Sequence, residues 1–518
     1  MNSSQAGISP IARKLQSPLW WLLILAAFLR FFRLGSKPFW SDEGVIWYMV
    51  LGHIQQDAPK IYQYANHWAI QLFGWNEFAG RFPSALFGIL AIPVIYAVGR
   101  RLFDSRYAIT AAGVAAVSPY LIPLSQEMRN YSLVGLELWL ALWFFLELTQ
   151  RKNPHRIWWL VFFAVGIVGL YSHCFFVFVL IYLGIAFICR SGWKNRRIWI
   201  QYWIVFALII LLGIPELNKT LNAAAGRAQI GAADLFHLKM NLYRVARSYF
   251  CFLFGDYQTN LPGTLIPFLR SHPLHLITSL CMICVWPATV ITAAVRSLRF
   301  LHGQGFRSFA MKTFFGMMIG FTLFYLVIDV NTAAHLIFAY VPFLFIFTHF
   351  WTQPKQNGWN KGITTLFLGL TAISLLFYYR SDTHTYERAD WRSAGGFLDR
   401  NTSASDAILL LRARDAYYTL RFYQSKPQGN YLFTPRHVPN AQQDSLLANW
   451  WKSEDPLSVM AKVEALLEQH PRVWIVETSR NFDPKQKGGV LRIQTHEFGW
   501  ELQIHRVEKA SPEDAGMR

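Results

Sequence analysis

Two adjacent carboxylates, Asp42 and Glu43, follow the first apolar segment of this 518-residue chain, in the stretch Pro-Phe-Trp-Ser-Asp-Glu-Gly at residues 38–44. Acidic side chains so close to hydrocarbon are costly unless they face water or a polar site. A carboxylate can also take a proton from a hydroxyl while that hydroxyl attacks an electrophile. Asp42 is therefore the candidate general base and Glu43 a second candidate catalytic residue. The alternative is a solvated loop that is incidentally acidic.

Other polar residues stand in short segments between apolar runs. Arg binds phosphate through a planar fork and Lys binds it as a point charge, so cations and hydrogen-bonding side chains here could hold a phosphate. The candidate phosphate ligands are Lys60, Arg129, Tyr131, His173 and His335. Glu127 is a candidate metal ligand. The alternatives are an arginine at a span end, histidines buried at helix interfaces and an exposed lysine.

A carboxylate base beside phosphate-binding cations, at the depth of a membrane surface, suits the transfer of a group from a lipid phosphate. Phosphate is a good leaving group, so positioning and charge stabilisation supply most of the catalysis. No residue in this set requires a cofactor, and a divalent metal remains an open alternative.

The composition shows what positions these residues. The chain is 53% hydrophobic and 15% charged, with recurrent apolar runs long enough to cross a bilayer, which indicates a polytopic membrane protein. A net charge of +19 would suggest nucleic acid in a soluble chain, but the basic residues lie mostly between apolar runs, where they orient the protein. We therefore expect no nucleic-acid partner. The five cysteines form no disulfide framework.

Hydropathy predicts about eleven spans. They lie near residues 18–34, 81–99, 106–123, 133–150, 157–171, 174–189, 198–214, 273–295, 312–329, 335–351 and 362–379. Basic residues before the first span place the N-terminus in the cytosol, and later basic clusters fall in loops of the same side. Residues 35–80 and 215–271 are then extracytoplasmic, with amphipathic helices at the membrane surface.

From Arg380 the composition becomes that of a soluble domain. Segments 407–411, 473–477 and 501–507 resemble strands, and 457–469 has helical spacing. The prediction is a transmembrane catalytic domain over 1–379 and a small extracytoplasmic α/β domain over 380–518.

Several motifs resemble the GT-C glycosyltransferases, most of all the branch of protein O-mannosyltransferases and aminoarabinose transferases. Their order along residues 18–350 is also similar. The motifs are Arg-Phe-Phe-Arg-Leu-Gly (30–35), Phe-Trp-Ser-Asp-Glu-Gly (39–44), Phe-Gly-Trp-Asn-Glu-Phe (73–78), Arg-Phe-Pro-Ser-Ala-Leu-Phe-Gly (81–88), Gln-Glu-Met-Arg-Asn-Tyr (126–131), Tyr-Ser-His (171–173) and the span from His335 to Pro342.

The resemblance implies a GT-C fold and an inverting transferase that takes its sugar from a polyprenyl phosphate. Asp42 matches the family's base, Glu43 follows it as in the motif, and Arg129 matches the arginine near the donor phosphate. Two positions depart from the pattern. Residues 57–62 lack the family's His-Pro-Pro-Leu-Tyr, where Lys60 could replace the histidine as a phosphate partner, and His335 stands where relatives have arginine.

The leading hypothesis is a multi-pass enzyme of a bacterial plasma (inner) membrane, with its C-terminal domain on the periplasmic side. It would glycosylate a hydroxyl of a protein, lipid or glycan acceptor. A lipid or solute transporter is the second hypothesis, although its usual internal repeats are not evident. A non-catalytic membrane scaffold is the third. The sequence names neither the sugar nor the acceptor.

Overall fold

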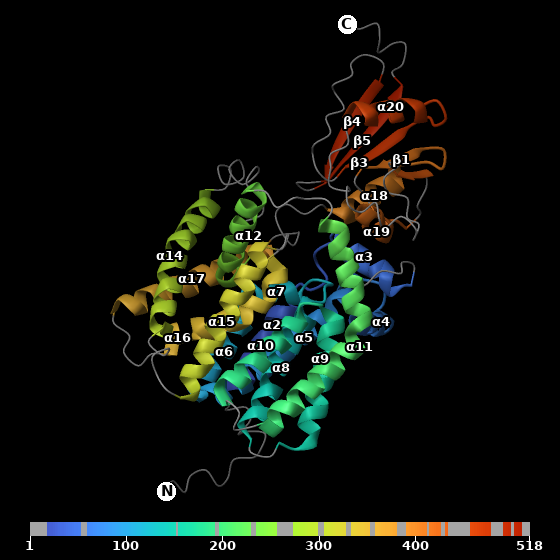
Figure 1. The fold of residues 1–518 in the computed structure, drawn as a ribbon. Coiled ribbons are helices and arrows are strands. Elements are labelled where there is room, and N and C mark those ends of the chain that lie inside the picture. The colour runs from blue at the N-terminus through green and yellow to red at the C-terminus, as the bar shows by residue number, and fades with distance from the viewer. Residues whose placement is uncertain are drawn as a thin grey trace. The chain divides into compact units, whose positions relative to one another are not determined.

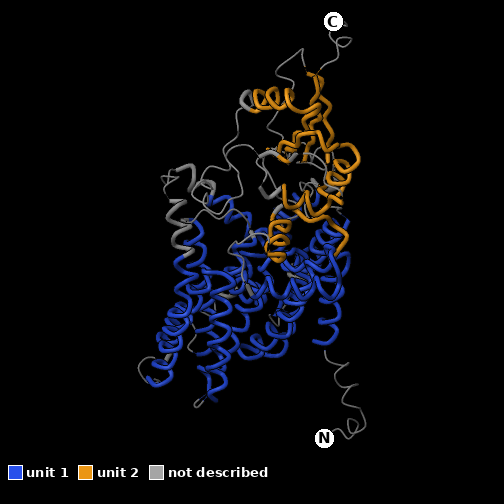
Figure 2. The backbone as a smooth tube through the Cα atoms, turned by 90° about the vertical axis from the view of Figure 1, so that its right-hand side faces the viewer, with its two compact units in different colours: residues 1–34, 57–224, 231–380 blue, residues 35–56, 225–230, 381–518 orange. Residues whose placement is uncertain are grey.

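The computed structural model describes residues 18–52, 60–151, 154–191, 196–228, 235–255, 273–298, 305–327, 333–352, 358–380, 390–411, 414–425, 430–433, 456–477, 491–498 and 502–509. Two compact units emerge (Figure 2). The helical unit contains residues 1–34, 57–224 and 231–380, and the C-terminal unit contains 35–56, 225–230 and 381–518. The segment that carries Asp42 therefore clusters with the chain's last part, whereas the sequence analysis assigned it to the transmembrane domain.

Helices make up the described part of the helical unit (Figure 1). Their bounds are α2 Pro18–Phe31, α4 Lys60–Phe73, α5 Glu77–Leu102, α6 Ser105–Ala116, α7 Leu121–Ser125, α8 Tyr131–Gln150, α9 Arg156–Ser172, α10 Phe176–Ser191, α11 Arg196–Ala228, α12 Leu235–Phe254, α14 Pro273–Leu298, α15 Phe306–Val327, the 3₁₀ helix η4 Ala333–Leu336, α16 Ile337–Thr352 and α17 Gly358–Arg380.

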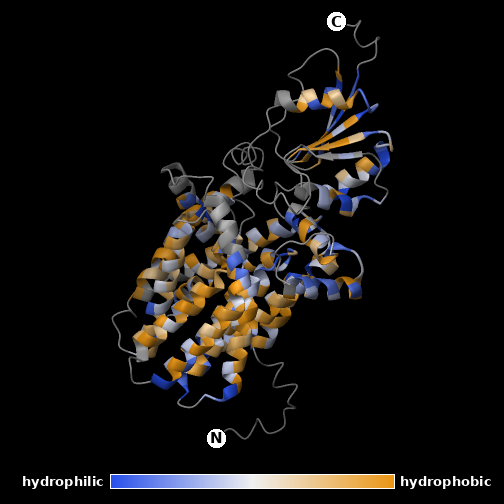
Figure 3. Ribbon diagram, turned by 45° about the vertical axis from the view of Figure 1, so that its right-hand side comes forward, coloured by the Kyte–Doolittle hydropathy of each residue, from blue (hydrophilic) through white to orange (hydrophobic). Residues whose placement is uncertain are grey.

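Six of these helices are long and apolar enough to cross a membrane, and four shorter helices are also apolar. Figure 3 shows apolar residues along most of their length. Each of the eleven predicted segments overlaps one or two described helices, which confirms a multi-pass, mainly helical membrane protein. The number of crossings and their orientation remain predictions.

Two predicted boundaries were wrong. The expected span 106–123 is two helices, α6 and α7, because the chain turns at residues 117–120 before α7 begins. The span expected to end at residue 214 continues as α11 to Ala228, with Pro215 inside the helix. The helix accommodates this proline.

Small residues allow α5 and α6 to approach closely. The α6 sequence is rich in alanine, and its buried face includes Ala108, Ala111 and Ala112. A Cβ at Gly99 of α5 would lie 2.8 Å from the Ala108 Cα. Close backbone approach through glycine and alanine is typical of helix pairs in membranes, where apolar burial alone gives little association energy.

The C-terminal unit contains a five-stranded mixed sheet in the order β2-β1-β3-β5-β4. The strands are β1 Ala407–Leu410, β2 Asn430–Phe433, β3 Val473–Glu477, β4 Leu491–Phe498 and β5 Leu502–Lys509. β1 pairs in parallel with β2 and β3, and β5 pairs antiparallel to β3 and β4. The predicted strands correspond to β1, β3 and β5, whereas β2 and β4 were missed.

Helices cover both faces of this sheet. Side chains of α18 (Trp391–Asn401) and α19 (Arg414–Tyr423) share a buried cluster with one face, which includes Trp474 and Ile504. Side chains of α20 (Pro456–Leu466), the helix predicted at 457–469, share a second cluster with the other face. Burial on both faces explains why β1 and β3 are continuous apolar runs.

Hydrogen bonds to Asp406 connect the start of β1 with the start of β3. The Asp406 carboxylate accepts hydrogen bonds from the Ser403 backbone N–H (2.9 Å), the Trp474 indole (3.1 Å) and Arg472 Nε (3.0 Å). Burial raises the pKa of Asp406, but these bonds and the arginine charge outweigh it and leave the pKa below its ordinary 3.8. The folded state thus binds fewer protons than the unfolded state below about pH 4, and this stabilisation is lost as pH falls through that range.

We expect Asp406→Asn to destabilise the C-terminal unit by about 2 kcal/mol at pH 7, because an amide N–H₂ would face N–H donors. Hydrogen exchange of β1 and β3 in the full-length protein measures this. Glu508, which is partly exposed and pairs with Arg506 at 2.6 Å, provides the control Glu508→Gln, with an expected change under about 1 kcal/mol. Equal exchange in both variants would contradict the prediction.

Candidate active site

The stretch from Ser125 to Tyr131 joins α7 to α8 and satisfies the end of α2. The Gln126 amide nitrogen donates to the carbonyls of Leu29 (3.2 Å), Arg30 (3.0 Å) and Phe32 (2.9 Å). The last carbonyls of a helix have no partner within the helix, so inside a membrane bundle they need such donors. Gln126 is almost fully buried, and its carbonyl accepts from Tyr378 at 2.9 Å.

Arg30, at the end of α2, in turn caps α6. Its guanidinium is fully buried and donates to the carbonyls of Ala116 (3.0 Å) and Ala115 (3.2 Å). A cation is favoured at a helix C-terminus because the helix dipole is negative there. α2, α6 and the 125–131 stretch are therefore held together by their ends.

The backbone of Arg129 is fixed by the start of α5. Ser84 Oγ lies 3.0 Å from the Arg129 carbonyl and 2.7 Å from the Tyr62 hydroxyl of α4. Ser84 and Tyr62 are fully buried. This contact connects the motifs at 81–88 and 126–131, which lie far apart in the sequence, and it fixes where the arginine side chain begins.

Arg129, Tyr131 and His335 form the candidate phosphate cluster. Arg129 Nη2 lies 3.3 Å from the Tyr131 hydroxyl, and this hydroxyl lies 3.2 Å from His335 Nε2. The arginine also lies over the tyrosine ring, 5.4 Å from its centre. Tyr325 of α15 donates to the His335 carbonyl at 2.5 Å and so fixes η4. Three side chains that can donate to an anion thus converge from the start of α8 and from η4.

His173 is the fourth member of this cluster. The centre of its ring lies 6.2 Å from the centre of the His335 ring. Asn130 donates to the Ser172 carbonyl at 2.8 Å, which ties the 125–131 stretch to the turn after α9. Burial, together with the neighbouring His335, lowers the pKa of His173 to about 3, so its imidazole is neutral at pH 7. Arg129 therefore supplies the permanent charge of the cluster.

Asp42 and Glu43 lie in the first turn of α3 (Ser41–Val50), in the C-terminal unit. Asp42 is partly buried and Glu43 is fully buried. Glu43 Oε2 accepts the Trp40 backbone N–H at 3.2 Å, the contact of an acidic N3 residue with its N-cap. The structure thus gives Glu43 a structural contact, and its catalytic role stays a prediction.

For two predicted site residues, Lys60 and Glu127, the described structure shows no contact that bears on the predicted role. α4 begins at Lys60, but the lysine side chain lies outside the described residues. Glu127 is buried beside Arg129, whose N–H donates to its carbonyl at 2.8 Å. Within the described ranges, no three or more His, Cys, Asp or Glu side chains converge as a metal site. Metal binding by Glu127 therefore stays a prediction.

Sequence reasoning missed several supporting residues. Tyr325, Ser84 and Asn130 each hold the cluster through a hydrogen bond; Ser84 and Asn130 lie within motifs of the resemblance, but no sequence pattern indicated Tyr325. Glu137 did give a signal, because an acidic residue inside an apolar span is unusual. Its carboxylate accepts from Ser172 Oγ at 2.7 Å, immediately before His173.

Comparisons with known proteins agree with this architecture. Residues 57–214 match the family model described as dolichyl-phosphate-mannose-protein mannosyltransferase. The crystal structure of ArnT from Cupriavidus metallidurans, bound to undecaprenyl phosphate, aligns over 96% of this chain and 99% of its own, with a TM-score of 0.55 and 13% identity. No curated protein sequence matches the chain at a significant level.

Two further likenesses are weaker. An Archaeoglobus fulgidus oligosaccharyltransferase in complex with zinc and sulfate aligns over 89% of this chain and 68% of its own, at 13% identity and a TM-score of 0.48. The mycobacterial arabinofuranosyltransferase AftD (mutant R1389S) aligns over 95% of this chain and 41% of its own, at 13% identity and a TM-score of 0.47. Likenesses at this level assign no property to the chain.

The chain has the fold of the ArnT structure, a mainly helical multi-span membrane fold with a small C-terminal mixed sheet. The mannosyltransferase family pattern covers residues 57–214, which is less than half of the chain, and the fold agrees with the one that the resemblance to GT-C glycosyltransferases implied.

We expect Gln126→Leu to lower the melting temperature of the detergent-solubilised protein. The change removes the donor from three carbonyls at the end of α2, which should cost roughly 1–3 kcal/mol. Gln71→Leu is the control, because Gln71 is exposed on α4 and bonds only to the exposed His67 among the contacts described. Equal melting of the two variants would show that the α2 end does not depend on Gln126.

Proposed function

We propose that this enzyme transfers a sugar from a polyprenyl phosphate to an acceptor hydroxyl at the extracytoplasmic face, with inversion at the anomeric carbon. The observation that carries the proposal is the convergence of Arg129, Tyr131, His335 and His173. An arginine beside neutral donors matches a phosphate that gains charge as the sugar leaves. The undecaprenyl phosphate in the similar ArnT structure supports a lipid-phosphate donor.

In the proposed reaction the acceptor oxygen attacks the anomeric carbon on the face opposite the phosphate. The new glycosidic bond forms while the bond from carbon to phosphate oxygen breaks, and the phosphate departs with the electron pair. The hydroxyl proton passes to the Asp42 carboxylate. Arg129 stabilises the departing phosphate, with Tyr131 and the two histidines as hydrogen-bonding partners and Lys60 as a further cation.

The membrane context follows from the charge pattern. Basic residues before the first span and in alternate loops place the N-terminus in the cytosol, and the 125–131 stretch then falls on the opposite side. In a bacterial plasma membrane that side is periplasmic, and the acceptor is a protein, lipid or glycan exposed there.

We expect Arg129→Gln to weaken binding of undecaprenyl phosphate about 10- to 100-fold, because a charged hydrogen bond contributes roughly 1.5–3 kcal/mol. Equilibrium binding to protein in nanodiscs measures this. Arg151→Gln is the matched control: Arg151 follows the opposite end of α8 and pairs with Glu147 at 2.6 Å. If both variants bind like wild type, Arg129 is not a phosphate ligand.

We expect Asp42→Asn to reduce sugar transfer about a hundredfold or more while leaving undecaprenyl phosphate binding unchanged, because an amide cannot accept the acceptor's proton. The assay follows radiolabel from a set of polyprenyl-phosphate sugars into total cell-envelope material, with protein in proteoliposomes. Glu77→Gln, in the first turn of α5, controls for loss of a carboxylate elsewhere in the chain. Equal transfer by wild type and Asp42→Asn would exclude Asp42 as the base.

Glu43→Gln separates the two roles of Glu43. Glutamine can still accept the Trp40 N–H at the helix N-terminus. Transfer should therefore stay within a few-fold of wild type if Glu43 acts only as a cap, and should fall as in Asp42→Asn if its charge takes part in the reaction.

A further inference from the structure

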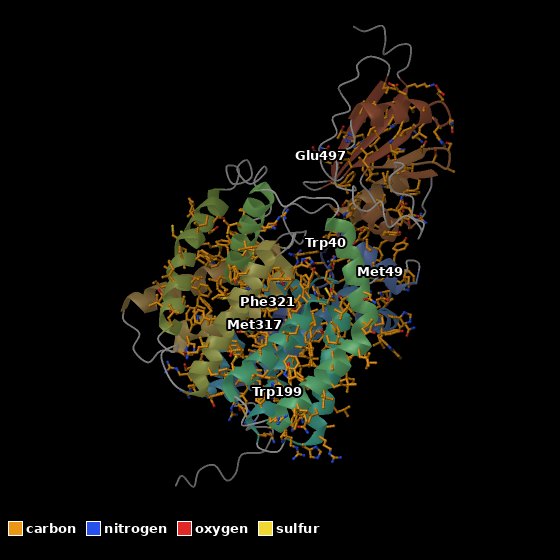
Figure 4. The ribbon with its side chains drawn as sticks, in the orientation of Figure 1. Trp40, Met49, Trp199, Met317, Phe321 and Glu497 are labelled. Carbon is orange, nitrogen blue, oxygen red and sulfur yellow. The ribbon has the colours of Figure 1, made fainter. Side chains whose placement is uncertain are left out.

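Helix α3, which carries Asp42, packs along α19 within the C-terminal unit. Phe422 of α19 lies between two aromatic side chains of this segment, with ring centres 4.9 Å from Phe39 and 4.8 Å from Trp47. The Tyr418 ring contacts the Tyr48 ring in a tilted arrangement, with their centres 4.9 Å apart. Figure 4 labels Trp40 and Met49, which mark the two ends of α3. Residues near position 40 are thus packed by residues near position 420.

The two helices approach so closely because residue 44 is glycine. A Cβ at this position would lie 2.1 Å from Thr419 Oγ1 and 2.7 Å from Thr419 Cα. The second contact is with backbone, so a side chain at residue 44 would push α3 away from α19 rather than displace a flexible atom. Gly44 is two residues after Asp42, so this displacement would reach the carboxylate directly.

Polar contacts fix the chain on the other side of Asp42. The Phe39 backbone N–H donates to the Tyr423 hydroxyl at 2.5 Å. Arg392 of α18 donates to the Ser36 carbonyl at 3.1 Å, and its guanidinium lies over the Tyr423 ring. Tyr423 is thereby held between the segment before α3 and α18.

Asp42 therefore lies between two points that α19 fixes, one at Phe39 and one at Gly44. A side chain in the first turn of a helix takes its direction from the backbone of that turn. A general base must also reach the acceptor hydroxyl to within hydrogen-bond distance, and small misplacements of a catalytic group can cost as much as about 100-fold in rate.

We propose that α19 positions the catalytic base, with Tyr423, Thr419 and Gly44 as positioning residues for Asp42. This inference rests on the proposed function. It gives the C-terminal unit a part in transfer itself, in addition to any recognition of the acceptor. None of the three residues touches the reacting atoms, so their effect passes through the placement of α3.

Gly44→Ala and Tyr423→Phe test the inference in the full-length protein in proteoliposomes. Both should lower kcat, Gly44→Ala by roughly 10- to 100-fold and Tyr423→Phe by a few-fold. KM for the polyprenyl-phosphate sugar and the affinity for undecaprenyl phosphate should stay within about twofold of wild type, because the phosphate cluster belongs to the helical unit. A general loss of structure would not separate kcat from donor binding in this way.

Matched control substitutions, one of glycine and one of tyrosine, exist elsewhere in the C-terminal unit. Gly396→Ala, on α18, adds a Cβ whose nearest neighbour is the flexible end of Arg400 at 3.5 Å. Tyr431→Phe removes a hydroxyl that bonds to Gln424 inside the C-terminal unit. Both should leave kcat within about twofold of wild type. Thr419→Gly, which removes the side-chain atoms nearest to a residue-44 Cβ, should restore part of the kcat lost in Gly44→Ala.

The outcomes separate the inference from the function on which it rests. If wild type transfers sugar, Asp42→Asn does not, and Gly44→Ala and Tyr423→Phe match wild type, positioning by α19 is wrong while the function stands. If Gly44→Ala loses kcat and donor binding together and Thr419→Gly restores neither, the contact is structural only and the inference fails. If wild type transfers no sugar from any donor in the set, the proposed function fails first.

Discussion

The need to satisfy helix-end carbonyls inside a membrane bundle governs this structure. No water is available there, so each carbonyl left over at a helix end requires a protein donor. Gln126 serves the end of α2, and Arg30 at that end serves α6. The first contact comes from the irregular stretch between α7 and α8, whose Gln126 is bonded through both its amide nitrogen and its carbonyl. Residues 125–131 thus have a structural role in helix packing in addition to any role in the candidate site.

The same constraint explains why the phosphate cluster is well defined. Arg129 and Tyr131 follow Gln126 within five residues. The bonds from Gln126 to the carbonyls at the end of α2 therefore also restrain the backbone that carries Arg129 and Tyr131. Ser84 and Asn130 hold this backbone against α5 and α9. Preorganised donors stabilise developing charge without reorganising during the reaction. In this chain the preorganisation and the stability of the helix ends come from one set of hydrogen bonds.

The sequence was informative where one physical effect dominates. Apolar runs located the membrane helices, and the charged or aromatic residues between them gave Arg129, Tyr131, His173 and His335, which the structure brings together. It was uninformative where a contact is long-range. Nothing near residue 40 indicates α19 as its neighbour, because a glycine permits close approach without naming what approaches. β4 was a different case: its alternating apolar residues, such as Leu491 and Ile493, did give a period-two signal that was missed.

The proposal distributes one reaction over two compact units of the chain. The proposed phosphate ligands belong to the helical unit, and the proposed base belongs to a segment that folds with α19. A polyprenyl-phosphate sugar is an activated donor, so water is a competing acceptor whenever a base is available beside it. A base that is correctly oriented only through its contact with α19 makes proton removal depend on the state of the C-terminal unit. If the acceptor binds that unit, its arrival and the placement of Asp42 are linked through the same helix, and transfer to the acceptor is favoured over hydrolysis.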